Sequence, residues 1–187
     1  MEFTDLNEQQ ILEEIKDCVH MAGHPTFDDT CLCDARQKRF VSTIKNGSSI
    51  IHFWGWYVPS HRYAMLRFAS EDEPIALKDS DAARQIINGI NAHTPFYHYS
   101  LCPHCNGIEL HFALYVPIKG FPRKKFGDLF QALIGESINI RPMIIDVIRK
   151  GGTFDDLQEV RQGQCHEPTA EAISDTKGEK NEEETIE

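Results

Sequence analysis

The turn Cys102-Pro103-His104-Cys105 is the short motif in this chain whose residue types and spacing are best suited to chemistry. Two thiols separated by two residues can exchange a disulfide or chelate one metal ion. In thioredoxin-like redox sites the first thiol lies at a helix N-terminus, whose dipole lowers the pKa of that thiol. Here Asn106-Gly107 and a β-type pattern follow instead of a helix, so the sequence disfavours thiol redox catalysis.

Zinc binding is a second chemistry that these cysteines could support. Cys31 and Cys33 would point the same way on an extended segment, because side chains alternate along a strand. With Cys102 and Cys105 they would supply four thiolates for a tetrahedral structural zinc site, and His104 is a substitute ligand. The alternative is that the cysteines are reduced, partly buried thiols without a ligand role, as is usual inside cells.

The remaining motifs do not predict an enzyme. The sequence contains no Ser/His/Asp spacing, nucleophile elbow, glycine-rich phosphate loop or HExxH motif. His98 and His111 could face each other across a hairpin, and such a cross-strand pair favours packing and hydrogen bonding over metal binding. We therefore assign no catalytic residue.

The elements that would position these residues follow from hydrophobic periodicity. Residues 96–118 alternate with a period of two on both sides of Asn106-Gly107, which predicts a hairpin. Apolar residues at helical spacing predict helices elsewhere. The predicted elements are a helix over 7–22, strands over 40–44, 50–58 and 63–68, a helix over 81–92, the hairpin, a basic loop over 119–125, a helix from 128 that restarts at Pro142, and a short helix over 153–160.

Short connections between strands predict an antiparallel sheet with its helices gathered on one face. The predicted fold class is α+β, with the order α-β-β-β-α-β-β-α. One domain over residues 1–162 is expected, followed by an acidic tail over 163–187. From Glu167 to Glu187 eight acidic residues face two lysines, and only Ile173 and Ile186 are large and apolar, which predicts disorder.

Charge and hydropathy exclude several classes of protein. A net charge of −10 argues against non-specific nucleic-acid binding, which requires a positive surface. The first ten residues have neither the basic nor the apolar region of a secretory signal, and no apolar run reaches the length of a membrane span. We therefore expect a cytoplasmic protein that binds neither nucleic acid nor membranes.

An aromatic strand provides the candidate partner-binding residues. Within the segment 50–58, Trp54 and Trp56 share one face, and Phe53 and Tyr57 share the other. If helices cover one face of the sheet only, some of these four rings are exposed, and exposed aromatic rings are anchors for protein partners. A strand covered on both faces, by dimerisation or by the tail, is the alternative.

The order helix, β-meander, helix, hairpin, helix, with Asn88 and Asn91 near the end of the second helix, resembles the type III secretion chaperone-like fold, including the YbjN-like bacterial proteins. The resemblance covers residues 7–150. It implies a small, non-enzymatic protein that acts as a homodimer and holds or regulates other proteins. A zinc-stabilised regulatory domain, built on Cys31/Cys33 and Cys102/Cys105, is the alternative function.

Overall fold

The computed structural model describes residues 6–30, 37–47, 49–70, 75–102 and 107–164. Within these ranges, six strands form one antiparallel sheet in the order β1-β2-β3-β4-β6-β5. The strands are β1 (Phe27–Thr30), β2 (Lys38–Asn46), β3 (Ser49–Val58), β4 (Tyr63–Ser70), β5 (Tyr97–Leu101) and β6 (Ile108–Tyr115). The α-helices are α1 (Glu8–Met21), α2 (Ser80–Asn91), α3 (Arg123–Gly135), α4 (Arg141–Arg149) and α5 (Phe154–Gln164). The predicted α+β class with an antiparallel sheet is confirmed.

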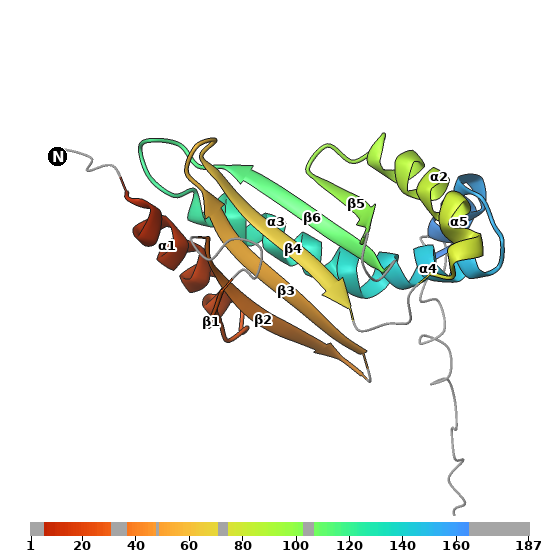
Figure 1. Ribbon diagram of the computed structural model, residues 1–187, viewed down its shortest axis with the longest axis horizontal. Helices are drawn as coiled ribbons and strands as arrows, with labels where there is room; N and C mark the ends of the chain where they lie inside the picture. Colours follow the sequence, from red (N-terminus) through yellow and green to blue (C-terminus); the bar gives the residue numbers. More distant parts are fainter. Residues whose placement is uncertain (1–5, 31–36, 48, 71–74, 103–106, 165–187) are drawn as a thin grey trace, which may run out of the picture.

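The helices lie on one side of the sheet and beyond one edge of it. Helices α1 and α3 cover one face, whereas α2, α4 and α5 gather past the β5 edge (Figure 1). Helix α3 continues through a π-helical segment, η2 (Glu136–Ile140), into α4, and a 3₁₀ turn, η1 (Leu77–Asp79), precedes α2. This two-layer arrangement leaves the second face of the sheet without a covering helix among the described residues.

Aromatic rings fill the layer between the sheet and α3. Phe53 and Phe68 come from β3 and β4 and stack with centroids 5.1 Å apart. Phe130 of α3 lies 5.4 Å from Phe53, and Phe126 of the same helix packs near Phe112 of β6. All five side chains are at most 2% exposed, so replacing any one of them with alanine would cost about 3–5 kcal/mol.

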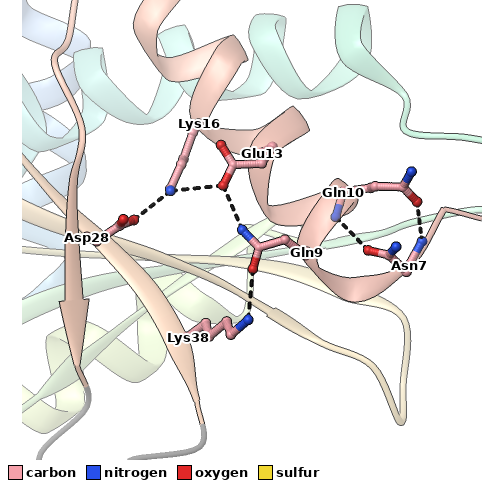
Figure 2. A network of polar contacts seen from close by, with 7 residues as sticks. All are labelled: Asn7, Gln9, Gln10, Glu13, Lys16, Asp28 and Lys38. Carbon is pink, nitrogen blue, oxygen red and sulfur yellow. Dashed lines mark hydrogen bonds and ion pairs between the residues drawn. The ribbon is translucent and has the colours of Figure 1, made fainter.

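Helix α1 begins as the sequence predicts. The Asn7 side chain accepts a hydrogen bond from the Gln10 backbone N–H at 2.9 Å, and the Gln10 side chain accepts one from the Asn7 N–H at 2.8 Å. This is a complete capping box. Lys16 of the same helix pairs with Asp28 of β1 at 2.6 Å, which ties α1 to the sheet edge (Figure 2).

Two local predictions require correction. Residues 27–30 form a separate strand, β1, so the meander has four strands instead of three. Residues 123–125 are the first turn of α3 and not part of a loop. Arg123 pairs with Glu14 and with Asp17 of α1, the latter at 3.3 Å. These ion pairs join residues about a hundred positions apart, and hydrophobic periodicity carries no information about them.

The β5 edge of the sheet is closed by a side chain. The Asn91 amide of α2 accepts a hydrogen bond from the Tyr99 N–H at 2.8 Å and donates one to the Tyr99 carbonyl at 2.9 Å. The Tyr99 hydroxyl donates to Glu136 at 3.0 Å, and burial, followed by the charge of Glu136, raises the pKa of Tyr99. These contacts hold α2 and η2 against β5.

Candidate binding surface

Side chains on the face of the sheet that α1 and α3 do not cover form the candidate site, which we call the open face. The strand register places one row of residues across all six strands on this face. The row is Phe27, Val41, Trp54, Arg67, His111 and His98. A second row runs beside it through Arg39, Trp56, Met65 and Ala113.

Strands β1, β3, β4 and β6 contribute aromatic side chains to the open face. Seven large hydrophobic side chains of the described residues are exposed, and three of them lie on this face. Phe27 is 62% exposed, Tyr115 52% and Tyr63 39%. The ring centroids of Tyr63 and Tyr115 are 6.1 Å apart. The half-buried rings of Trp54 and Trp56 lie among them. Such a concentration of exposed aromatic surface is typical of a binding site.

The four aromatic residues named from the sequence separate by face, as their alternation indicates. Trp54 and Trp56 lie on the open face. Phe53 is fully buried and Tyr57 is 5% exposed, both on the covered face. The binding role expected for Phe53 and Tyr57 therefore does not fit this fold, because the helical layer occupies the space that a partner would need.

The β4–β6–β5 part of the open face carries a polar cluster that the sequence did not reveal. Arg67 pairs with Glu109 of β6, and its guanidinium lies 5.5 Å from the ring centroid of Trp54. Burial alone would raise the pKa of Glu109, but hydrogen bonds from His111 and Arg67 outweigh it and hold that pKa at about 2. Glu109 is 5% exposed and stays ionised at neutral pH. The sequence signal that could have indicated this cluster is the acidic residue Glu109 between Ile108 and Leu110, because alternation along the strand places its side chain on the face opposite to theirs.

The same cluster holds two stacked histidines. His98 and His111 are directly opposite each other, with ring centroids 4.9 Å apart and planes 8° from parallel. Parallel imidazoles direct their nitrogens away from a common point, so the pair is arranged for packing and not for chelation. Among the described residues, no group of three or more His, Cys, Asp or Glu side chains is placed to hold a metal ion.

The cluster also lacks the geometry of a catalytic triad. His111 Nε2 lies 2.9 Å from Ser100 Oγ and 3.2 Å from Glu109 Oε2. In a triad the acid binds one ring nitrogen and the nucleophile binds the other. Here both partners meet the same nitrogen, so Glu109 cannot orient His111 as a base for Ser100.

The cysteines predicted as zinc ligands are described only in part. Cys31, Cys33 and Cys105, with the substitute ligand His104, lie outside the described residues. Cys102 is buried next to β5, and its thiol hydrogen-bonds to Glu109. The zinc site stays a prediction, as does the disorder of the acidic tail, which lies outside the described residues apart from its first positions, 163 and 164, in α5.

A cavity of about 320 Å³ lies at the opposite end of the molecule, between α1, β1 and β2. Its charged groups already have protein partners: Asp28 pairs with Lys16, and Asp29 pairs with Arg39 at 2.6 Å. Lys38 donates to the Gln9 side chain at 3.0 Å (Figure 2). Because the charged side chains of the lining are already paired within the chain, the cavity is a weaker candidate than the open face.

Comparison with known proteins adds no assignment. No protein-family model, curated protein or solved structure matches the chain. The resemblance to the type III secretion chaperone-like fold therefore stays a prediction. No helix of the described residues is long and apolar enough to cross a bilayer.

Proposed function

We propose that this protein is a non-enzymatic, cytoplasmic protein-binding module, as the secretion-chaperone-like resemblance implies, and that its open face binds a protein partner. The observation that carries the proposal is the aromatic surface of Phe27, Trp54, Trp56, Tyr63 and Tyr115 on a sheet face without a covering helix in the described structure. The partner to which we commit is a second copy of the chain.

The size of the face supports this partner. Six strands about 4.8 Å apart, with a longest strand of ten residues at about 3.3 Å each, give a surface on the order of 700 Å² once the short edge strands are included. A specific interface of standard size buries about 600–1,000 Å² per partner. Two such faces packed together are therefore large enough for a specific dimer.

The charge of the face also supports self-association. The chain as a whole carries −10. The middle of the open face holds its charges as two internal pairs, Asp29–Arg39 and Arg67–Glu109. Because each of these charges is already compensated within one copy, two open faces would meet with little net charge between them, despite the −10 of the chain.

Sedimentation velocity from about 10 nM to 100 μM tests the proposal, because this range covers both tight and weak dimers. We expect a dimer whose dissociation constant rises at least about tenfold for Trp56→Ser, since truncating a central aromatic anchor costs about 2 kcal/mol. The matched control is Phe96→Ser, which removes a 60% exposed ring that precedes β5. A monomeric wild type, or an equal loss in both variants, contradicts the proposal.

Truncation after Gln164 distinguishes a second copy from the chain's own C-terminal segment. If two copies share the open face, the shortened chain dimerises as the full chain does. A full-length monomer that becomes a dimer on truncation would mean that residues 165–187 occupy the face instead. Circular dichroism of each variant verifies that the fold is retained.

The zinc-stabilised regulatory domain stays the alternative prediction from Cys31, Cys33, Cys102 and Cys105. Metal analysis of protein purified without chelator tests it, and less than about half an equivalent of zinc per chain would contradict it.

A further inference from the structure

The histidine stack, His98 and His111, lies at one end of the open face and consists of two side chains that become cationic when they are protonated. His98 and His111 face each other across β5 and β6 at 4.9 Å, on the row that also holds Trp54 and Arg67. Two neutral imidazoles stack favourably, whereas two imidazolium ions at this separation repel each other. The stack is therefore stable in its neutral form and strained in its doubly charged form.

The groups around the stack decide its net charge. Arg67 of β4 contributes a positive charge, and Glu109 of β6 contributes a negative charge that persists throughout the titration of the histidines. Ser100 of β5 is neutral. Burial, followed by the charge of His111, lowers the pKa of His98, so a doubly charged stack forms only in acid. Arg67 and Glu109 cancel each other, so a doubly protonated stack would give the cluster a net charge of +2 and a neutral stack would give it zero.

We propose that the His98–His111 stack makes association through the open face sensitive to pH, so that two copies bind each other at neutral pH and separate in mild acid. This inference rests on the proposed function, because it concerns the same face and the same partner. Association brings each stack from solvent into an interface, and a charged stack is more costly to desolvate than a neutral one.

The direction of the pH effect on association distinguishes the histidine stack from the net charge of the chain. The sequence pI is about 5.3, so acidification from pH 7.5 to 5.5 brings the whole protein close to neutrality. Loss of net charge weakens the general repulsion between copies and strengthens association. If the dimer dissociates over the same pH interval, a local group in the interface must therefore weaken association by more than the loss of net charge strengthens it. A dimer contains two stacks, so a roughly threefold penalty per copy multiplies to about tenfold.

Sedimentation equilibrium of the full chain at pH 7.5 and 5.5, at constant ionic strength, tests the inference. We expect the wild-type dissociation constant to rise about tenfold at pH 5.5. His98→Gln keeps a polar side chain but removes one of the two charges, and we expect its change to stay below about threefold. The matched control is His20→Gln, an exposed histidine on α1, which covers the opposite face and should behave as the wild type does.

The outcomes separate the two proposals. A wild-type dimer that is equally tight or tighter at pH 5.5 overturns the pH inference and leaves the proposed partner intact. The same holds if His98→Gln weakens in acid as strongly as the wild type. A wild-type chain that stays monomeric at pH 7.5 overturns both.

Discussion

The contact between Gly55 and Phe40 gives the most direct test of how the sheet supports its two aromatic faces. Gly55 of β3 is the direct cross-strand partner of Phe40 in β2, on the covered face. A Cβ atom at position 55 would lie 2.2 Å from Phe40 Cζ and 2.3 Å from Cε1. Phe40 is fully buried, so its ring has no solvent-exposed space into which it can move.

We expect Gly55→Ala to destabilise the fold by about 1–3 kcal/mol, the usual cost of overpacking a filled core. The gain in strand propensity from glycine to alanine, below about 1 kcal/mol, opposes this cost but does not cancel it. Gly127→Ala in α3 is the matched control, because nothing lies within 4 Å of its added Cβ. That substitution should stabilise the helix by up to about 1 kcal/mol.

Urea unfolding followed by circular dichroism measures both effects, and a double-mutant cycle assigns the cause. Phe40→Ala alone should cost about 3–5 kcal/mol by leaving a cavity. Adding Gly55→Ala to that background should then change stability by less than about 1 kcal/mol, because the clashing ring is gone and only the closer approach of Leu66 Cδ2, 3.0 Å from the added Cβ, opposes the gain in strand propensity. If Gly55→Ala costs the same with and without the Phe40 ring, the clash is not the cause and the reasoning is refuted.

Three further predictions concern single contacts. Glu109→Gln should lose about 2 kcal/mol at pH 7 by removing the carboxylate from Arg67. The pKa of Glu109 in the folded protein, about 2, is below the ordinary 4.5, so the stability that its carboxylate contributes is present above pH 5 and disappears as the pH falls towards 2. Urea unfolding across this pH range measures the loss. If Glu109→Gln loses stability in acid as the wild type does, the Arg67–Glu109 pair is not the cause. Asn91→Ala should cost about 2 kcal/mol and lower the hydrogen-exchange protection of the Tyr99 amide, and unchanged protection would show that the edge does not need this side chain. Asn7→Ala should cost about 1 kcal/mol by removing the capping box, with thermal unfolding as the measure and an unchanged midpoint as the contrary result.

Much of the fold could be predicted because local patterns determine it. Alternation along β3 separated Trp54 and Trp56 from Phe53 and Tyr57, and the structure has them on opposite faces. The first helix, predicted over 7–22 and observed as α1, and the short last helix, predicted over 153–160 and observed as α5, also depend on neighbours in sequence. Thr153 and Asp156 form the hydrogen bonds that begin α5, at 2.6 to 3.3 Å.

The features that escaped prediction depend on residues far apart in the chain. The first turn of α3 is held by α1 through Arg123, Glu14 and Asp17. The polar cluster of the open face forms because β4 and β6 are neighbours in the sheet although α2 and β5 separate them in the chain. Strand alternation indicates which face a side chain occupies, but only the strand order shows that Arg67 and Glu109 meet.

The Asn91 clamp on Tyr99 limits how many copies could join. An unprotected strand edge invites another strand, and repeated edge pairing extends a sheet into a fibril. With the backbone of Tyr99 already bound by an amide, the β5 border is a poor template for such growth. At the other border, β1 has only four residues, two of them aspartates. If two copies pair through their open faces, as we propose, the pairing would use the same face on both copies and close with two-fold symmetry, and neither sheet border would readily extend it.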